Sequence, residues 1–370
     1  MTRIEKLNKF YKSGSVDAFL VTSSVAIKYF SGYFFNFETG PSPFHLLPAA
    51  LLIIPGEEAS LIIADNELDK VPASHPGISI RPYASYEYTK APEFAKQFLA
   101  QLNKSIRQHK LQHARVGIEP NALPYAVAQS LGAQYPKMGF KDITRDIDRL
   151  RVIKDEDEIE AIRRAAGLCD VGQAAVVKYA RTGITELELF AHVRRDIEAA
   201  AGARVPLMAD LVSGERTFSG GGGPTDRMIR EGDLVLSDLT PCLNGYWGDS
   251  CSTIAIGDPA RGQKKTFERV KRALEKGIEA VRPGVKALEI DGIMRGQTGD
   301  YPHHGGHGVG TMYHEEPRIV AYNDTVLVPN MVIALEPAVY ERGYGIRLEH
   351  LVLVTESGCE ILTQFKHCFD

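Results

Sequence analysis

Four carboxylates embedded in apolar, strand-like segments constrain this 370-residue chain more than any other feature. Asp238 ends the run LVLSD, and Asp249 follows eleven residues later in GYWGD. Glu336 lies within MVIALEP, and Glu349 lies within GIRLEHLVLV. An unpaired buried charge is very costly, and four carboxylates gathered together would repel one another. Two divalent cations would neutralise them, so the pattern indicates a site for a pair of metal ions.

Each pair of carboxylates is centred on a candidate hairpin turn. The midpoint of Asp238 and Asp249 is 243.5, where a two-residue loop would place the aspartates directly opposite each other. A turn at Asn244-Gly245 would instead shift the register by one residue per strand. The midpoint of Glu336 and Glu349 is 342.5, within the sequence ERGY. The sequence leaves the register of the first hairpin open.

His307 in HHGGHGVG is a fifth candidate ligand. Glycines on both sides permit a close approach of the backbone to a ligand. One imidazole with four carboxylates favours Mn, Co, Fe or Zn in a catalytic site, since structural zinc prefers thiolates. Two such ions about 3.5 Å apart would share a water, lower its pKa and aim it at a carbonyl. Taken singly, each of the five residues has an ordinary structural explanation; the order and spacing of all five carry the prediction.

The first part of the chain, up to about residue 150, is predicted to be an α/β unit. Strand-like runs at 17–23, 50–54, 60–64 and 114–119 alternate with helical patterns at the N-terminus and over 92–109. This alternation favours a mixed or parallel sheet. The segment contains neither a dinucleotide-binding glycine motif nor a phosphate-binding loop.

The second part repeats one arrangement of elements. Asp155 with Glu158 and Thr185 with Glu188 are capping boxes that predict two helix starts. Strands are expected next, over 234–241 and 246–256. The same order then recurs, with helices over 263–281 and about 287–294 and strands over 331–340 and 346–354. Helix, helix and hairpin therefore appear twice, which predicts one pseudo-symmetric α+β domain.

Composition excludes several classes of protein. Lys and Arg number 43 against 47 Asp and Glu, and this balance argues against a nucleic-acid-binding protein. The longest apolar run has nine residues and contains a proline, so no membrane span is expected and we place the protein in the cytoplasm. The five cysteines lack CxxC spacing, which favours free thiols in a reducing compartment.

These motifs resemble the pita-bread metallopeptidases, which include methionine aminopeptidase, aminopeptidase P, prolidase and the metal-free creatinase. The resemblance is carried by GDLVLSD, GYWGDSCSTIAIG, HHGGHGVG, YHEEPRI, MVIALEPAVY and GYGIRLEHLVLVT. The segment DRLRVIKDEDEIEAIRRAA resembles the entry into the catalytic domain of these enzymes. The resemblance implies a pita-bread domain over residues 148–370, preceded by a smaller α/β creatinase-like domain over residues 1–147.

The same resemblance, which is closest to prolidase, implies a dinuclear-metal hydrolase. Its substrates would be Xaa-Pro dipeptides or short Xaa-Pro peptides, cleaved at the amide bond by a metal-bridging hydroxide. Mn is the expected metal, with Co, Zn and Fe as alternatives, and the expected assembly is a homodimer. The implied ligands are Asp238, Asp249, His307, Glu336 and Glu349.

Further roles follow from matching positions. Glu336 would act as general base as well as ligand, and His314 would stabilise the tetrahedral intermediate. Arg318 would bind the carboxylate of a dipeptide, because a planar guanidinium pairs with a carboxylate bidentately. His303 would line the substrate pocket, and Arg347 would hold a metal-bound carboxylate in place.

Two positions depart from the family pattern. Gly221 stands where the peptidases carry a histidine that steadies the substrate, and His350 stands where an aspartate is common. Gly221 keeps a second hypothesis open, namely hydrolysis of a non-peptide amide or cyclic amidine, as in creatinase-like or ectoine-hydrolase-like relatives. A third hypothesis is a catalytically inactive binding relative. Dipeptidase and aminopeptidase activities also both stay open.

Overall fold

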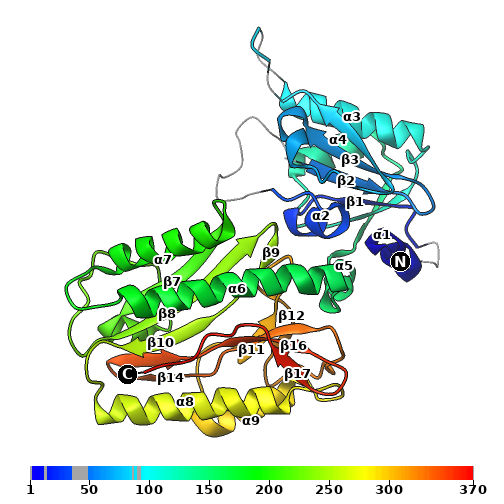
Figure 1. Cartoon of the computed structure of the whole chain (residues 1–370). Helices are drawn as coiled ribbons and strands as arrows, with labels where there is room; N and C mark the ends of the chain where they lie inside the picture. The colour runs from blue at the N-terminus through cyan, green and yellow to red at the C-terminus, as the bar shows by residue number, and fades with distance from the viewer. Residues whose placement is uncertain (1, 12–14, 36–48, 86, 90–92, 370) are drawn as a thin grey trace. The chain divides into compact units, whose positions relative to one another are not determined.

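The computed structural model describes residues 2–11, 15–35, 49–85, 87–89 and 93–369. The chain divides into two compact units, Met1–Arg151 and Val152–Asp370 (Figure 1). The first unit is α/β and the second is α+β, so the predicted fold class is confirmed. The predicted boundary between residues 147 and 148 falls within helix α5 (Thr144–Val152).

A six-stranded mixed sheet forms the centre of the first unit, in the order β4-β3-β2-β1-β5-β6. Its strands are β1 (Ala18–Val21), β2 (Ala49–Ile53), β3 (Ala59–Ala64), β4 (Ile78–Tyr83), β5 (Arg115–Ile118) and β6 (Gly139–Asp142). The accompanying helices are α1 (Arg3–Phe10), α2 (Ser24–Ser31), the 3₁₀ helix η2 (Asp65–Lys70), α3 (Phe94–Gln108), α4 (Tyr125–Gln134) and α5. Strands β1 and β2 pair antiparallel, whereas β1 and β5 pair parallel, as a mixed sheet requires.

Side chains of the central strands alternate between two apolar cores. Leu20 and Leu52 pack into one core, while Phe19 and Leu51 pack into the other. Successive side chains of a strand point to opposite faces, so both faces of this sheet are buried. This explains why β1, β2 and β3 are continuous apolar runs in the sequence.

Four long helices frame the second unit. They are α6 (Glu156–Tyr179), α7 (Glu186–Ala201), α8 (Arg261–Ala280) and α9 (Ala287–Thr298). Both predicted capping boxes are present: the backbone N–H of Asp155 donates to Glu158 over 3.1 Å, and that of Thr185 donates to Glu188 over 2.8 Å. These bonds occupy helix-end groups that have no partner inside the helix, and they fix where α6 and α7 begin.

The strands of the second unit lie between α6 and α7 on one side and α8 and α9 on the other (Figure 1). One sheet has the order β10-β8-β7, with β9 paired to β8, and contains β7 (Leu207–Ser213), β8 (Leu234–Leu243), β9 (Tyr246–Trp247) and β10 (Cys251–Ala255). The other has the order β12-β11-β13-β16-β17 and contains β11 (Gly306–Gly308), β12 (Glu315–Ile319), β13 (Val332–Leu335), β16 (His350–Val354) and β17 (Cys359–Ile361). A hairpin of β14 (Ala338–Glu341) and β15 (Tyr344–Arg347) extends from β13 and β16, and the 3₁₀ helix η3 (Gly214–Ser219) follows β7. The predicted repeat of helix, helix and hairpin is therefore present.

Each repeat has its own apolar core. Val193 of α7 packs in a core with Leu239 of β8. Val270 of α8 packs in a separate core with Ile333 of β13. The helices thus cover one side of each sheet.

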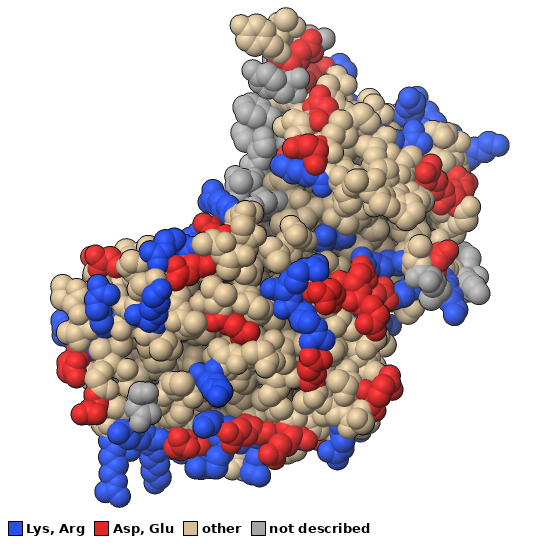
Figure 2. Space-filling model, in the orientation of Figure 1, with Lys and Arg blue, Asp and Glu red and all other residues tan. Residues whose placement is uncertain are grey.

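The surface and the thiols agree with the expectations from composition. Lys and Arg side chains are interspersed with Asp and Glu side chains on the face shown in Figure 2. All five cysteines are free thiols, and three of them are buried. Among the described residues, no helix combines the length and the apolar character needed to cross a lipid bilayer.

Candidate metal centre

The aspartate hairpin turns at Asn244-Gly245. Cys242 pairs with Trp247 in this hairpin. Asn244 and Gly245 have φ angles of 51° and 84°, and two positive values are what a tight two-residue hairpin turn requires. The register therefore follows the second of the two alternatives left open by the sequence.

This register places Asp249 opposite Thr240 rather than opposite Asp238. Cys251 pairs with Asp238, and the N–H of Gly248 donates to the carbonyl of Pro241 over 2.9 Å. Thr240 and Asp238 are two residues apart, so they point to the same face of the sheet. Both aspartates accordingly share one face, and Thr240 Oγ1 donates to Asp249 Oδ1 over 3.1 Å.

The glutamate hairpin places its two carboxylates directly across from each other. Leu335 pairs with His350, and Ala338 pairs with Arg347. The positions between these pairs are Glu336, next to Pro337, and its opposite residue Glu349. The N–H of Leu348 donates to the carbonyl of Pro337 over 3.4 Å, which continues the same register.

His307 lies on β11, between two glycines whose backbones are tightly packed. A Cβ at Gly306 would lie 2.0 Å from the carbonyl oxygen of Ala334, and one at Gly308 would lie 2.3 Å from that of Glu316. No side chain fits in either place, so the glycines allow β11 to pack between β12 and β13. His307 Nδ1–H donates to the carbonyl of Gly308 over 3.0 Å. The other nitrogen, Nε2, is thereby left as the atom available to a metal.

The structure brings all five predicted ligands to one pocket. His307 Nε2 lies 3.6 Å from Asp249 Oδ2 and 3.5 Å from Glu336 Oε1. Asp249, His307 and Glu349 each offer a ligand atom within 4.8 Å of the others, and all three are buried. The five residues come from both repeats of the second unit, as the places of the carboxylates in the two predicted hairpins implied.

Burial perturbs the titration of this cluster. Burial raises the pKa of Asp249 and of Glu349 well above the usual carboxyl range, and the neighbouring carboxylates add to the effect. Burial also raises the pKa of Asp238 to about 6, although the Arg347 guanidinium opposes it. Burial acts on Glu336 in the same direction, but a hydrogen bond from His304 and nearby positive charges lower its pKa to about 2. The charged forms of these buried carboxyls are therefore disfavoured, and bound cations would stabilise them.

The donor set fits a pair of divalent metal ions. Glu349 Oε2 is buried and has no hydrogen-bond partner among the described residues. Leaving a carboxylate oxygen in that state is costly unless a cation occupies the space beside it. Burial lowers the pKa of His307 to about 3, so its imidazole is neutral near pH 7, in the form that binds metals.

Arg347 lies beside this cluster and contacts one of the candidate ligands. Its Nη2 donates to Asp238 Oδ2 over 2.5 Å, and its Nη1 donates to the carbonyl of Gly220 over 2.7 Å. The side chain is almost fully buried. Arg347 therefore contacts a candidate ligand, and its role in holding a metal-bound carboxylate stays a prediction.

The pocket has a volume of about 390 Å³ and includes two further predicted residues, His303 and His314. His303 Nδ1–H donates to the carbonyl of His304 over 2.7 Å, and Nε2 lies 2.9 Å from the hydroxyl of Tyr340. The ring of His314 lies 4.2 Å from that of His307. Arg318 is exposed on β12 and is not among the residues that line the pocket. Its role as a carboxylate anchor stays a prediction.

A larger cavity of about 500 Å³ lies near the end of α6. Among the described residues that line it, Glu231 is the only acidic one and none is a histidine. We therefore place the candidate site in the smaller cavity.

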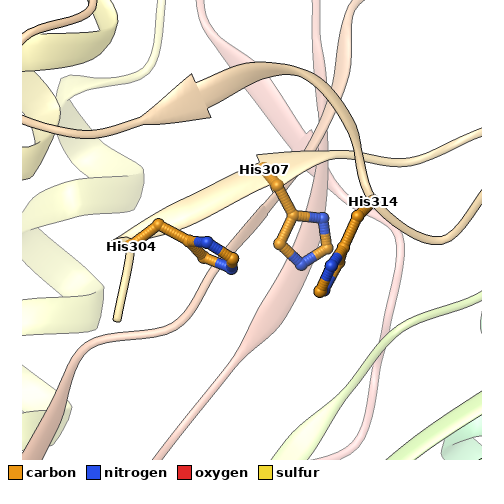
Figure 3. A group of neighbouring side chains, drawn as sticks. All are labelled: His304, His307 and His314. Carbon is orange, nitrogen blue, oxygen red and sulfur yellow. The ribbon is translucent and has the colours of Figure 1, made fainter. Parts of the chain in front are cut away.

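Among the carboxylate and histidine side chains that line the pocket, the sequence reasoning missed two, His304 and Asp210. His304 Nε2 lies 2.9 Å from Glu336 Oε1. Figure 3 shows its ring in a group with His307 and His314, and the three offer nitrogens within 4.8 Å of one another. The doubled histidine in HHGGHGVG was the available signal for His304. Asp210 lies on β7 and belongs to no motif.

Comparison with known families gives two matches. The family described as Metallopeptidase family M24 matches residues 160–356. The Creatinase/Prolidase N-terminal domain matches residues 3–153.

Individual relatives match along almost the whole chain. The Xaa-Pro dipeptidase of Pyrococcus furiosus is 32% identical over 372 residues, which cover 98% of this chain and 97% of the relative. The Xaa-Pro dipeptidase of Pyrococcus horikoshii is 30% identical over 369 residues, with the same coverage. Among solved structures, the prolidase from Pyrococcus horikoshii OT3 superposes with a TM-score of 0.83 at 29% identity, covering 100% of this chain and 99% of the other. The prolidase from Pyrococcus furiosus gives a TM-score of 0.80 at 30% identity, covering 97% and 100%.

Proposed function

Because the chain belongs to metallopeptidase family M24, we propose that it is a two-metal Xaa-Pro peptidase, acting on Xaa-Pro dipeptides or short Xaa-Pro peptides. The chain is a metallopeptidase. The single observation that most supports the finer proposal is the convergence of four carboxylates and His307 in one pocket. Of the metals that such a donor set suits, Mn is the one we propose, with Co, Zn and Fe as alternatives.

The residues of the pocket, together with Arg318 outside its lining, would divide the work as follows. The metal ions, when bound by the five ligands, would lower the pKa of a water and polarise the scissile carbonyl. A carboxylate oxygen of Glu336 would accept the proton of the attacking water and pass it to the leaving nitrogen. His314 would hydrogen-bond to the developing oxyanion, and Arg318 would pair with the carboxylate of the departing product.

Metal analysis joined to a peptidase assay tests the proposal. Protein purified without chelators and loaded with Mn should hold two equivalents and hydrolyse Gly-Pro, Ala-Pro or longer Xaa-Pro peptides. Asp249→Asn should lose metal and activity together, because Asp249 is a buried candidate ligand. Asp258→Asn is the matched control, since Asp258 is exposed. Fully loaded protein that hydrolyses none of these peptides would favour the non-peptide amide substrates that Gly221 leaves open.

We also propose that the protein is a homodimer, as the family resemblance implies, and that it is cytoplasmic. Sedimentation of the metal-loaded protein should give twice the chain mass of 40.7 kDa. A single species at the chain mass would contradict the dimer without bearing on the activity.

A further inference from the structure

Asp210 occupies the space that a side chain at residue 221 would fill. A Cβ built on Gly221 would lie 2.0 Å from Asp210 Oδ2 and 2.8 Å from its Cγ. A side chain at 221 would therefore collide with the Asp210 carboxylate in its present position. The absence of a side chain at Gly221 is what lets this carboxylate reach the pocket, where Asp210 is one of the lining residues.

The strand register fixes where Asp210 points. On neighbouring strands β7 and β8, Asp210 pairs directly with Asp238. Directly paired residues project from the same face of a sheet, so Asp210 faces the pocket beside a candidate metal ligand. Two like charges in this position repel each other unless a cation offsets them.

The nearby cation is engaged mainly with Asp238. Arg347 Nη2 lies 2.5 Å from Asp238 Oδ2 but 3.7 Å from Asp210 Oδ2. Within the described part of the chain, the side chain of Asp210 accepts no hydrogen bond, and it is 40% exposed. Its carboxylate thus faces the open pocket and retains the capacity to bind another donor.

The net charge of the pocket determines whether it favours a positive or a negative group on the substrate. Two divalent cations would balance the four candidate ligand carboxylates, and Arg347 adds one positive charge. The negative charge of Asp210 offsets the positive charge of Arg347. A hydroxide formed from water would then give the pocket a net negative charge. A positively charged group on the substrate is then favoured near Asp210, and a negatively charged one is disfavoured.

The chemistry of an Xaa-Pro substrate narrows the position of that group. The proline ring carries no charge, and the carboxylate that follows it would be repelled by Asp210. The cation must therefore belong to the residue before the scissile bond, which carries an α-ammonium in every such substrate and a second positive charge when it is lysine or arginine. Met208 lies two residues before Asp210, shares its face of β7 and also lines the pocket. Its thioether chain offers an apolar surface for the methylene stem of a lysine or arginine.

We propose that Asp210 is a specificity-determining residue, which selects substrates with lysine or arginine before the scissile bond. This inference rests on the proposed Xaa-Pro peptidase function. Asp210 binds the ammonium or guanidinium group of that side chain.

The test is the ratio of kcat/KM for Lys-Pro to that for norleucine-Pro, which has a side chain of similar length without the charge. Wild-type protein should prefer Lys-Pro by about 10-fold or more, as a charge-assisted contact of about 1.5–3 kcal/mol implies. Asp210→Asn should bring the ratio close to one, and Asp210→Glu should keep most of it. Asp226→Asn is the matched control, because Asp226 is an exposed aspartate beyond the glycine run. A ratio that Asp210→Asn leaves unchanged, or a wild-type ratio near one, would overturn the proposal.

A binding measurement separates this proposal from the proposed function. Calorimetry on the metal-loaded protein gives the dissociation constants of lysine and norleucine, the corresponding products. Lysine should bind about 10-fold more tightly, and Asp210→Asn should remove the difference. If no Xaa-Pro peptide is hydrolysed but lysine keeps its Asp210-dependent advantage, the peptidase proposal fails and the role of Asp210 stands. Equal affinities for the two amino acids would overturn the role of Asp210.

Discussion

Arg347 donates from Nη2 to Oδ2 of Asp238 over 2.5 Å, although the two residues lie 109 positions apart in the chain. The arginine belongs to the second helix-helix-hairpin repeat and the aspartate to the first. A second bond from Nη1 to the carbonyl of Gly220 holds the guanidinium in place. One repeat therefore orients a candidate ligand that the other repeat supplies.

Arg347→Met should weaken Mn binding by about 10- to 100-fold, because Asp238 loses the contact that orients it. The measurement is calorimetric titration of metal-free protein. Arg342→Met is the matched control, since Arg342 is exposed in the turn of the same hairpin. Equal affinities of the two variants would show that Arg347 does not position the ligand.

Arg318→Ala distinguishes a dipeptidase from an aminopeptidase. If Arg318 binds the carboxylate of a dipeptide, kcat/KM for Ala-Pro should fall about 10- to 150-fold, the effect of losing a contact of about 1.5–3 kcal/mol. Ala-Pro amide, which has no carboxylate, should be affected far less, and metal content should not change. If kcat/KM for Ala-Pro and for Ala-Pro amide fell by the same factor, Arg318 would have only a structural role.

Lys154→Met should lower the free energy of unfolding by about 3–5 kcal/mol, because it removes the positive charge that faces a buried carboxylate. Lys154 Nζ lies 3.1 Å from Glu315 Oε2, with both side chains at most 3% exposed. Glu315 also accepts a hydrogen bond from the N–H of Met312, in the loop that carries His314. Urea denaturation measures the effect. The double variant Lys154→Met with Glu315→Gln should regain much of the lost free energy of unfolding. If it regains none, the loss does not come from the buried charge of Glu315.

Titration of His367 should contribute a loss of stability as the pH falls below about 6.5, whereas the raised pKa values of Asp238, Asp249 and Glu349 act in the opposite direction in the metal-free protein. Burial lowers the pKa of this imidazole well below its usual value, and its neighbours His350 and Lys271 add to the effect. The unfolded chain then binds a proton near pH 6.5 that the folded chain binds only at much lower pH, so protonation favours unfolding. Below the folded pKa this contribution to stability is fully lost.

His367→Asn should change the slope of the unfolding free energy against pH by removing this contribution, since asparagine does not titrate. His367 Nε2 is buried without a partner among the described residues, so a second proton would have no acceptor. Urea unfolding at several pH values between 7.5 and 4.5, with chelator present throughout, measures both slopes. Identical slopes for wild type and variant would exclude His367 as the titrating group.

Local signals in the sequence predicted most of the elements. The capping boxes at Asp155 and Thr185 gave the starts of α6 and α7, because a cap depends only on residues within one turn. The hairpin of Glu336 and Glu349 followed from its midpoint alone. The aspartate hairpin did not, since the choice of Asn244-Gly245 as the turn decides the register and the midpoint favoured another turn.

The sequence could not predict which strands pair with each other, or which side chains that pairing brings together. Asp210 enters the pocket because β7 pairs with β8 and because Gly221 lacks a side chain. Neither fact is written in the residues around Asp210. Arg318 shows the opposite case: its motif was recognisable, yet the fold places it outside the residues that line the pocket.

The split of the candidate ligands between two repeats has a consequence for how the protein folds. The first repeat supplies Asp238 and Asp249, while the second supplies His307, Glu336 and Glu349. A partly folded chain with one repeat formed has two or three ligands, so tight cation binding must wait until both repeats have docked. Contacts between such distant segments form slowly, because a long loop has to close first. Cation uptake would then report the last stage of folding, and a cation at 100 times its dissociation constant would add about 2.7 kcal/mol to the native state alone.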